Sequence, residues 1–499
     1  MTSMNLNELL KGFADAQGAG EILVSGLSLD SREIAAGYAF VALRGGKGHG
    51  MDFAAKAVEN GAVVILAEAP FDAADPGVPV ITVNDLREHT GAIAARFHAE
   101  PTKALEVIGI TGTNGKTSTV QLLAQALAFL HRKPATIGTL GAGMHGAVVE
   151  GERTTPDAIS MQGLFASFRD AGATHVAMEV SSHALEQGRV NAVGFDVAVF
   201  TNLTRDHLDY HGTMDAYGAA KAKLFAFEGL KAAVINVDDA FGAKLAKGLP
   251  AGVAKLRTSM AHEATEKDAE VRADIVVTSA KGLSFNLTTP WGMRTVRSAL
   301  LGRFNVANLL AVAAVLGALG EPFEKIHAAL EALEPVNGRM SRLGGDGKKP
   351  LVVVDYSHTP DALKQALLAL RSHTKGKLIC VFGAGGDRDV GKRPIMAGIA
   401  ERLADVVIVT DDNPRTEDGD AIVAQIVAGF VHPETVAVER DRAKAIALAL
   451  NGAKADDVVL IAGKGHETYQ EGPDGKLPFD DLAVAQGLMA QPAAKGARA

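Results

Sequence analysis

Cysteine is nearly absent from this chain of 499 residues, since Cys380 is the only one. A single cysteine cannot form an intramolecular disulfide, and it argues against a zinc site built from thiolates. The sequence also lacks an uninterrupted apolar run of membrane-spanning length, and its first residues lack the basic segment and apolar core of a secretory signal. These absences fit a reducing compartment, and we expect a cytoplasmic protein without a membrane span.

An excess of basic charge is missing as well. Lys and Arg total 50 against 58 Asp and Glu, which gives a formal net charge of -8. The composition therefore gives no indication of a nucleic-acid-binding surface. A hydrophobic share of 47% is typical of globular proteins that bury large cores, so disorder of the whole chain is excluded. We expect a monomer with small-molecule partners and no nucleic acid.

The length and the residue pattern predict several domains of one class. Chains of this length usually split into separate cores. Short apolar runs alternate with longer Ala/Leu-rich stretches, which is typical of parallel sheets flanked by helices, so the predicted fold class is α/β. A polar run with Pro101 precedes a new strand, and the segment EPVNGR follows a helical stretch further on. These places predict three domains, residues 1–100, 101–336 and 337–499.

Polar clusters follow the predicted strands. The strands that begin at Val107, Val176, Val197, Val352, Leu378, Val406 and Val458 lead into TGTNGKTS, EVSSH, TNLTRDHLDYHG, DYSHTPDAL, GAGGDRD, TDDNPR and AGKGHE, respectively. Ligands of open α/β sheets bind outside the carboxyl ends of the strands. We therefore expect these clusters to converge at two active faces, one on each of the last two domains.

The most informative local pattern is GTNGKT, between a predicted strand and a helix that begins near Thr117. Glycines let backbone N–H groups surround phosphate oxygens, and a helix N-terminus favours negative charge. Lys116 can neutralise the β- and γ-phosphates, while the Thr117 hydroxyl can ligate magnesium. Ile110 stands where the Walker A pattern has its first glycine. A chance Gly-rich turn is the alternative, but the strand–loop–helix context favours nucleotide binding.

Candidate metal ligands follow the neighbouring strands. Glu179 ends one of them, and His207 and Asp209 follow the next. Thr117 and one carboxylate suffice for a magnesium ion on a triphosphate, and Glu179 with His207 could serve a second ion. A single histidine is more often a hydrogen-bonded structural residue. The segment HLDYH could also indicate a zinc hydrolase, although the phosphate loop explains a metal better.

Among the candidate site residues, Lys221 has the weakest local sequence signal. It lies in AYGAAKAKLF on a predicted helix. Composition alone predicts a solvated lysine there.

Taken together, the segments of this chain resemble the Mur ligase family over nearly its entire length, and in order they match the family's diaminopimelate-adding member. The segments are LDSREIAAGYAFVALRG, TGTNGKTS, RTTPDA, MEVSSHALEQGRV, TNLTRDHLDYHG, AYGAAKAKLF, GRFNVANLLA, DYSHTPDAL, FGAGGDRDVGKRP, TDDNPRTE and AGKGHETYQ. The resemblance implies a three-domain architecture with a central P-loop ATPase-like domain and a C-terminal Rossmann-like domain. It further implies ATP-dependent addition of meso-diaminopimelate to the D-Glu carboxylate of UDP-MurNAc-L-Ala-D-Glu through an acyl phosphate, with two Mg2+ ions.

The resemblance also assigns site residues, position by position. For the UDP-muramoyl peptide it implies Leu29, Ser31, Gly46, Lys47, Gly48, Thr154, Thr155, Ser181, Gln187, Arg189 and Lys221; the family has Asn where this chain has Arg153. For ATP it implies Gly112, Thr113, Asn114, Gly115, Lys116, Thr117, Ser118, Asn305, Asn308, Arg339, Asp355 and His358. For diaminopimelate it implies Arg388, Asp412, Asn413, Pro414, Arg415, Gly463 and Glu467. The catalytic residues would be Lys116, Glu179, His207 and Lys221, and the metal ligands Thr117, Glu179, His207 and a carbamylated Lys221.

The residues implied for diaminopimelate lead to a chemical prediction. meso-Diaminopimelate carries a distal carboxylate and a distal ammonium, whereas lysine carries only the ammonium. Arg415 can pair bidentately with the carboxylate, and Glu467 can accept from the ammonium. Lysine would leave a buried arginine unpaired, so we expect it to be rejected.

Three alternatives remain at this point. A folate polyglutamate ligase shares the phosphate loop, but the segments TTPDA, EVSSHALEQGR and DNPR argue against it. A nucleotide-dependent switch would hold or hydrolyse ATP without an amine substrate. A non-catalytic nucleotide-sugar scaffold would have no use for the full set of magnesium candidates.

Overall fold

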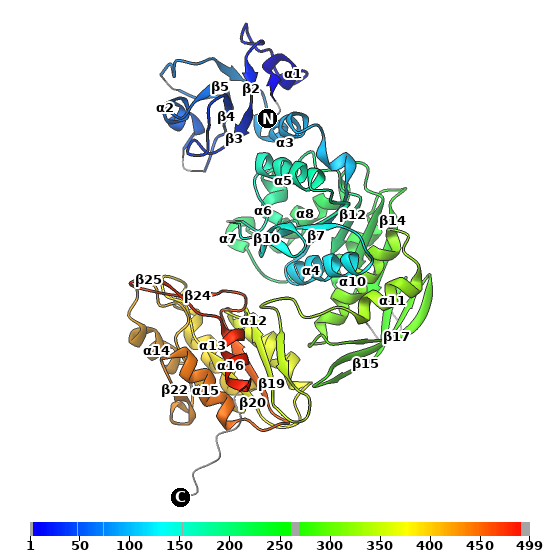
Figure 1. Ribbon diagram of the computed structural model, residues 1–499, viewed down its shortest axis with the longest axis vertical. Coiled ribbons are helices and arrows are strands. Elements are labelled where there is room, and N and C mark those ends of the chain that lie inside the picture. Colours follow the sequence, from blue (N-terminus) through cyan, green and yellow to red (C-terminus); the bar gives the residue numbers. More distant parts are fainter. Residues whose placement is uncertain (1–2, 47, 73, 152, 261–268, 491–499) are drawn as a thin grey trace, which may run out of the picture. The chain divides into compact units, whose positions relative to one another are not determined.

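The structure is a computed structural model that describes residues 3–46, 48–72, 74–151, 153–260 and 269–490. The chain divides into two compact units, Met1–Ser259 with Glu263–Val271 and Ala311–Lys325, and Met260–His262 with Arg272–Leu310 and Ile326–Ala499. Both units combine sheets with helices, which confirms the predicted α/β class (Figure 1). Within the described residues, no helix combines the length and the apolar character that a membrane crossing requires.

A small parallel sheet opens the first unit. Its order is β3 (Gly26–Ser28), β4 (Tyr38–Ala42), β5 (Ala62–Ala67) and β6 (Val80–Thr82). Helices α1 (Leu6–Leu10) and α3 (Leu86–Phe97) share an apolar core with one face, and η1 (Gly50–Phe53) and α2 (Ala54–Glu59) cover the other. Strand β1 (Met4–Asn5) pairs with β2 (Leu23–Val24), and η2 (Pro101–Ala104) leads into the next sheet.

The larger sheet of the first unit carries the phosphate loop. Of the eleven strands that the structure describes in it, eight lie in the order β10 (Ala147–Val149), β9 (Gly141–Met144), β8 (Pro134–Gly138), β11 (His175–Glu179), β7 (Glu106–Thr111), β12 (Val197–Phe200), β13 (Ala232–Asn236) and β14 (Ala254–Ser259). From β8 to β14 the pairing is parallel. The first of these strands in the chain, β7, lies between β11 and β12, so connections leave it in both directions. Ligand crevices form at the carboxyl end of a strand in this position.

Helices cover both faces of this sheet. Helix α4 (Lys116–Phe129) packs against β7, β8 and β11, while α5 (Ala158–Asp170) and α6 (Ser182–Glu186) belong to the core on the other face. The connections also form α7 (Leu208–His211), α8 (Met214–Ala222), η3 (Lys223–Ala226) and α9 (Ala240–Lys247). Burial on both faces explains why the central strands are continuous apolar runs and could be predicted from sequence.

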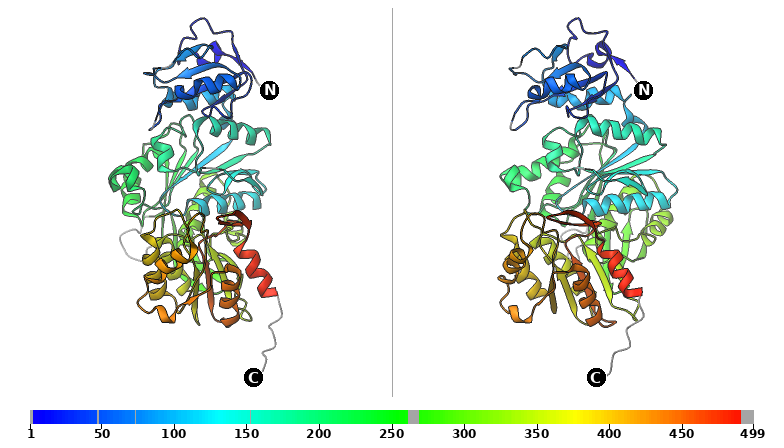
Figure 2. Two further views of the ribbon diagram at one scale, coloured as in Figure 1. Left: turned by 90° about the vertical axis from the view of Figure 1, so that its left-hand side faces the viewer. Right: turned by 60° about the vertical axis from the view of Figure 1, so that its left-hand side comes forward.

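The second unit is built on a six-stranded sheet. Its order is β18 (Ser341–Gly344), β19 (Leu351–Asp355), β23 (Val458–Ala462), β20 (Leu378–Phe382), β21 (Val406–Val409) and β22 (Ala437–Val438), with only β18 antiparallel. Helices α12 (Pro360–Arg371), α13 (Lys392–Leu403) and α14 (Gly419–Val427) share one core with it, and α15 (Arg442–Gly452) and α16 (Asp481–Ala490) share the other. Both views of Figure 2 show α16 along the outside of this unit.

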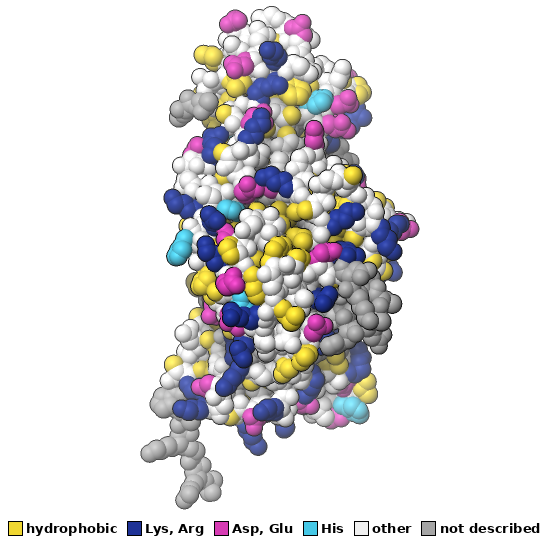
Figure 3. Space-filling view, turned by 90° about the vertical axis from the view of Figure 1, so that its right-hand side faces the viewer, with side chains coloured by type: hydrophobic (Ala, Val, Ile, Leu, Met, Phe, Trp, Pro, Cys, Tyr) yellow, Lys and Arg dark blue, Asp and Glu magenta, His cyan; other side chains and the backbone are white. Residues whose placement is uncertain are grey.

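The remaining elements are antiparallel strands and connecting helices. They are β15 (Val271–Ser279), β16 (Gly282–Thr289), β17 (Gly292–Ser298), α10 (Phe304–Ala318), α11 (Phe323–Glu331), η4 (Pro433–Thr435), β24 (Tyr469–Gly472) and β25 (Gly475–Pro478). On the face of the molecule in Figure 3, Lys and Arg side chains are interspersed with Asp and Glu.

A buried ion pair joins the two outer helices of the second unit. Arg442 and Asp481 are fully buried, and the Nε and Nη2 atoms of Arg442 each donate to a carboxylate oxygen at 2.7 Å. Arg442 also donates to the carbonyls of Asp411, at 3.2 Å, and of Ala462, at 3.1 Å. These carbonyls lie at the carboxyl ends of β21 and β23. One guanidinium therefore ties the ends of two strands to α16.

We expect Asp481→Ala to lower the free energy of unfolding by about 3–5 kcal/mol, because it leaves the Arg442 charge buried and unpaired. Urea unfolding followed by circular dichroism measures the change. Asp420→Ala is the matched control, since Asp420 pairs with Arg440 but its side chain is 83% exposed, and the expected change is below about 1 kcal/mol. Equal losses in the two variants would contradict the prediction.

Candidate active site

The phosphate loop connects β7 to α4 with the backbone that its glycines permit. Gly112 has a φ of 149° and Gly115 a φ of 86°, values that favour glycine. A side chain at position 112 would collide with the Thr201 hydroxyl. The loop is anchored to the end of β12, because the backbone N–H of Thr113 donates to the Asn202 carbonyl at 2.8 Å. The predicted strand–loop–helix arrangement is therefore present, with α4 beginning at Lys116.

The Lys116 ammonium lies over this loop. Its Nζ atom donates to the carbonyls of Gly112 and Thr113, each at 2.9 Å. The ammonium is thus held beside the N-terminus of α4, where backbone N–H groups and the helix dipole favour an anion. This arrangement can bind a polyphosphate.

Glu179 and Thr117 are brought together at the carboxyl ends of β11 and β7. The Glu179 side chain, only 1% exposed, accepts from the Thr117 hydroxyl at 2.9 Å and from the Thr139 backbone N–H at 2.8 Å. A hydroxyl and a carboxylate in contact are the oxygen ligands that Mg2+ uses beside a triphosphate. The residues present therefore fit one magnesium ion. Thr139 was missed by the sequence analysis because it follows β8, far from both partners in sequence.

Lys221 is buried, and the solvated lysine that composition predicts is wrong. It is 1% exposed, and its Nζ atom donates to the Gly112 carbonyl at 2.8 Å and lies 4.3 Å from the centre of the Tyr217 ring. Burial, assisted by the Lys116 charge, lowers the pKa of Lys221 to about 6. At neutral pH the amine is therefore mostly uncharged. Tyr217 and Lys221, four residues apart, share the inward face of α8, which composition does not reveal.

His207 belongs to an aromatic cluster beside this site. Its ring centre lies 4.9 Å from that of His183 and 6.0 Å from that of Tyr217. Burial, with a smaller effect of the neighbouring imidazoles, lowers the pKa of His183. The His207 side chain is 48% exposed and precedes the four-residue helix α7. His211 shares a hydrogen bond of 2.9 Å with the Ser182 hydroxyl.

The described residues do not support the interpretation of HLDYH as part of a zinc-hydrolase site. Among the described residues, no three His, Cys, Asp or Glu side chains are grouped so that they could hold a metal ion. Such a zinc site uses at least three protein ligands, whereas magnesium on a triphosphate needs few. The donor set thus fits the magnesium interpretation better.

A cavity of about 1960 Å³ lies within the first unit. Its lining includes the predicted residues Leu29, Ser31, Gly46, Gly48, Gln187 and Arg189. Lys47 lies outside the described residues. Thr154, Thr155 and Ser181 do not line the cavity. Their side chains bind Thr139, the Glu179 carbonyl and the Ala184 N–H, respectively.

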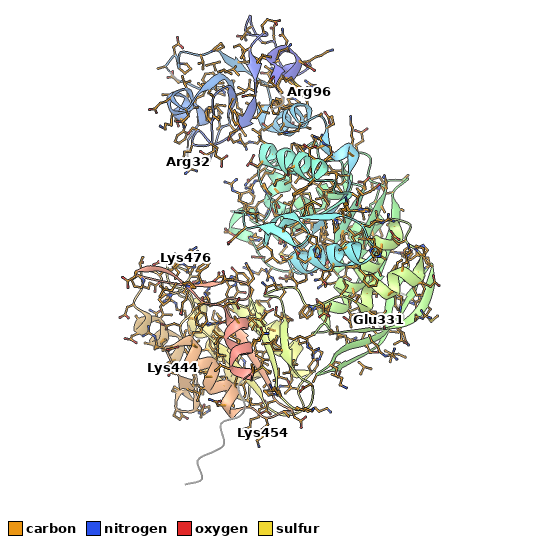
Figure 4. All side chains as sticks on the ribbon, in the orientation of Figure 1. Arg32, Arg96, Glu331, Lys444, Lys454 and Lys476 are labelled. Atoms are coloured by element: carbon orange, nitrogen blue, oxygen red, sulfur yellow. The ribbon has the colours of Figure 1, made fainter. Side chains whose placement is uncertain are left out.

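Basic side chains that the sequence analysis missed also line this cavity. They are Arg32, Arg44, Lys56 and Arg87; Arg153, which the sequence analysis names only as a departure from the family, lines the cavity too. Figure 4 labels Arg32 at the end of the N-terminal sheet. Guanidinium and ammonium groups bind phosphate oxygens well. No signal in a single sequence separates these residues from other surface cations, because they converge only after folding.

The residues predicted to bind adenosine and phosphate in the second unit form two groups. Asn308 donates to the Asn305 side-chain oxygen at 2.8 Å, and both are 5% exposed. Asp355 accepts from the Met340 N–H at 2.8 Å and from the Ser357 hydroxyl, and burial raises the pKa of Asp355.

Arg339 and His358 flank a tyrosine next to the second of these groups. The Arg339 guanidinium carbon lies 5.0 Å from the centre of the Tyr356 ring. His358 shares a hydrogen bond of 2.8 Å with the Tyr356 carbonyl, and burial lowers the pKa of His358.

Most of the residues predicted to bind diaminopimelate converge at the carboxyl ends of β21 and β23. Asn413 donates to Glu467 Oε2 at 2.8 Å. Gly463 has a φ of 121°, and a side chain there would collide with the Asp412 carboxylate. The backbone N–H of Arg415, the residue after Pro414, donates to the Glu471 carbonyl at 3.0 Å.

Arg415 is fixed from two sides. Its Nε atom donates to Glu471 Oε2 at 3.1 Å, and its Nη1 atom donates to the Gly386 carbonyl at 2.8 Å. No described residue accepts from Nη2. Its backbone is left-handed, with a φ of 54°. Arg388, by contrast, is exposed and donates to the carbonyl of the adjacent Asp387 at 3.3 Å.

A buried lysine in this group was missed by the sequence analysis. Lys464 is fully buried, and its Nζ atom donates to Asn413 Oδ1 at 2.8 Å and to Glu467 Oε2 at 3.2 Å. It lies inside the quoted segment AGKGHE, between the candidates Gly463 and Glu467, but nothing in the sequence indicates that it is buried.

Comparisons with known proteins identify the same family in three successive parts of the chain. Family models match as the Mur ligase family catalytic domain (residues 23–98), the Mur ligase middle domain (residues 110–316) and the Mur ligase glutamate ligase domain (residues 338–465).

Curated relatives cover the chain almost completely. UDP-N-acetylmuramoyl-L-alanyl-D-glutamate–2,6-diaminopimelate ligase of Xylella fastidiosa is 54% identical over 98% of both chains. The protein of the same name from Xanthomonas campestris is 56% identical over 97% of both. A solved structure of a protein of this name is 38% identical, has a TM-score of 0.74, and covers 98% of this chain and 99% of its own. The chain therefore belongs to the Mur ligase family.

Proposed function

We propose that the protein is an ATP-dependent ligase that joins meso-diaminopimelate to the D-Glu carboxylate of UDP-MurNAc-L-Ala-D-Glu in peptidoglycan precursor synthesis. Relatives that are 54% and 56% identical bear the name of this activity. The structural observation that carries the proposal is the contact of Glu179 with Thr117, next to Lys116 and the N-terminus of α4. This group can hold a triphosphate together with its cation.

Each of three domains binds one substrate. Residues 1–100 bind the uridine nucleotide, residues 101–336 bind ATP, and residues 337–499 bind the incoming amino acid. The cavity in the first unit supports the first assignment, because its volume of about 1960 Å³ is more than a small nucleotide needs. As part of the proposal, the protein acts in the cytoplasm as a monomer.

The first chemical step activates the carboxylate. A carboxylate oxygen attacks the γ-phosphorus of ATP, the bond to the bridging oxygen breaks, and ADP leaves an acyl phosphate behind. Lys116 and the N–H groups at the start of α4 face the charge that develops on the phosphate oxygens. The loop is anchored to β12 before the substrate arrives, so these donors need little rearrangement.

The second step forms the amide. The neutral amine of diaminopimelate attacks the acyl carbon and a tetrahedral intermediate forms; the bond from the acyl carbon to the phosphate oxygen breaks, inorganic phosphate leaves, and the nitrogen releases one proton to give the amide. The distal end of the amino acid is held by Arg415 and Glu467, with Asp412, Asn413, Pro414 and Gly463 shaping the site. Arg388 would have to change its contacts to take part.

Magnesium would be held by Thr117 and Glu179, and a second ion by Glu179, His207 and a carbamylated Lys221. When bound, these ions neutralise phosphate charge and polarise the transferred group. Lys221 as a free amine is a poor ligand for a hard cation, whereas its carbamate supplies oxygen atoms. The amine and CO2 form the carbamate with release of one proton.

We expect Lys221 to carry a carbamate in bicarbonate-equilibrated protein, because its amine is buried and mostly uncharged. Carbon-13 NMR after incubation with labelled bicarbonate should show one carbamate signal that Lys221→Gln removes. Lys223→Gln is the matched control, since Lys223 lies two residues away and is 49% exposed in an ion pair with Glu186. An active sample without that signal would refute the modification.

The function is tested by ATP turnover with UDP-MurNAc-L-Ala-D-Glu against a panel of amines. Release of ADP and phosphate should require both the muramoyl dipeptide and diaminopimelate, and the tripeptide product should appear by mass spectrometry. ATP hydrolysis that is indifferent to the amine would indicate a nucleotide-dependent switch. Activity with a folate and glutamate instead would indicate the folate polyglutamate ligase.

A further inference from the structure

The amino-acid site in the second unit contains two ion pairs, and one member of each pair is a residue that the sequence predicts to bind diaminopimelate. Arg415 pairs with Glu471 at 3.1 Å, and Lys464 pairs with Glu467 at 3.2 Å. Lys464 is fully buried, whereas the Glu467 side chain remains 17% exposed. A buried ammonium so close to a carboxylate that should receive an ammonium substrate needs an explanation.

The contacts of Lys464 fix the orientation of both neighbours. Asn413 Oδ1 accepts from Lys464 Nζ at 2.8 Å and from the Glu471 N–H at 2.9 Å. The amide nitrogen of Asn413 is thereby directed to Glu467 Oε2. Glu467 Oε2 accepts from both neighbours, and no described residue donates to Oε1. One oxygen is therefore left for a ligand.

The charge of Lys464 matters as much as its position. It offsets the Glu467 carboxylate in a largely dehydrated place, where charge interactions are stronger than in water. Asp412, 6% exposed, adds a further carboxylate, with the Arg442–Asp481 pair behind it. Removing the Lys464 charge makes this site one unit more negative, whatever its absolute charge.

We propose that Lys464 sets the charge selectivity of the amino-acid site, so that the site prefers a zwitterionic distal end over a cationic one. The inference rests on the proposed function. Arg415 supplies attraction for the distal carboxylate, and Lys464 prevents Glu467 from attracting a lone ammonium too strongly. Lys464 acts through Glu467 and Asn413, so it is a positioning residue and does not touch the reacting atoms.

The test compares three amino acids with Lys464→Met. They are meso-diaminopimelate, lysine, which has a cationic distal end, and 2-aminopimelate, which has an anionic one. Relative to diaminopimelate, kcat/KM for lysine should rise roughly tenfold and kcat/KM for 2-aminopimelate should fall roughly tenfold. These ratios do not depend on the fraction of folded enzyme, and a merely structural loss would not move the two analogues in opposite directions.

Two further variants keep the test decisive. Lys464→Arg retains the charge and should retain the wild-type ratios. The double variant Lys464→Met with Glu467→Gln removes both charges, so the opposite shifts should disappear even though overall activity is low. Shifts that persist in the double variant, or ratios that stay at wild-type values in Lys464→Met, would overturn the proposal.

Lys476→Met is the matched control. Lys476 lies on β25 (Figure 4), and its ammonium is 3.9 Å from the centre of the Tyr469 ring, which Lys464 approaches to 5.4 Å. It should keep the wild-type ratios. Wild-type protein that forms no product with diaminopimelate would refute the proposed function, and this result is distinct from unchanged ratios in an active enzyme.

Discussion

Lys116→Ala should reduce ADP formation in the presence of both co-substrates by about 1000-fold or more, the range found when a cation that stabilises a transferring phosphoryl group is removed. The Lys116 ammonium is the charge that the structure holds directly over the phosphate loop. Its loss exposes the developing charge on the γ-phosphate oxygens. Coupled ADP-release kinetics at saturating substrates measure the effect.

Lys103→Ala is the matched control for this variant. Lys103 is an exposed lysine just before β7, and its removal should leave the rate within about twofold, as expected for a surface position. Circular dichroism should show both variants folded. If Lys116→Ala released ADP at a rate close to that of the wild type, the assignment of this loop as the phosphate-binding site would be wrong.

Arg415→Ala should lower kcat/KM for diaminopimelate by about 100-fold, since truncation of one partner of a hydrogen-bonded charge pair that the bound amino acid would bury typically costs about 2–5 kcal/mol. The KM for ATP should stay near its wild-type value. Discrimination against lysine should fall, because lysine makes no use of this guanidinium. Initial rates with diaminopimelate and lysine, measured on the same preparation, give both numbers.

Lys444→Ala is the control for Arg415. Lys444 lies on α15 (Figure 4), and its side chain is 72% exposed, so neither selectivity nor rate should change. If Arg415→Ala discriminated between diaminopimelate and lysine as well as the wild type does, another group would have to bind the distal carboxylate. Arg388, which is exposed and flanks Gly385 together with Arg415, would then be the first candidate.

The central strands and the polar segments after them could be predicted from sequence, and the structure confirms them. The strands predicted to begin at Val197, Leu378 and Val406 begin at the same residues in the structure. Buried parallel strands are short apolar runs, so their signal is local. The Mur ligase resemblance is likewise confirmed. The individual site roles remain predictions, because no bound substrate tests them.

What sequence could not give are contacts between distant segments. The burial of Lys221 depends on which face of α8 meets the phosphate loop. The contact of Thr139 with Glu179 joins residues that are forty positions apart. Lys464 is invisible for the same reason, because an isolated lysine in a loop is usually solvated. Folding, not local pattern, decides which of these side chains lose water.

The left-handed backbone of Arg415 has an evolutionary consequence. A residue with a Cβ atom at a φ of 54° sacrifices roughly 1 kcal/mol that glycine would retain. Arg415→Gly should therefore relax the backbone, but it also removes the hydrogen bonds of the guanidinium to Glu471 and Gly386, which offset the gain. A library selected for thermal resistance alone should thus show no strong preference for glycine there, whereas growth that requires the enzyme should hold the arginine in place.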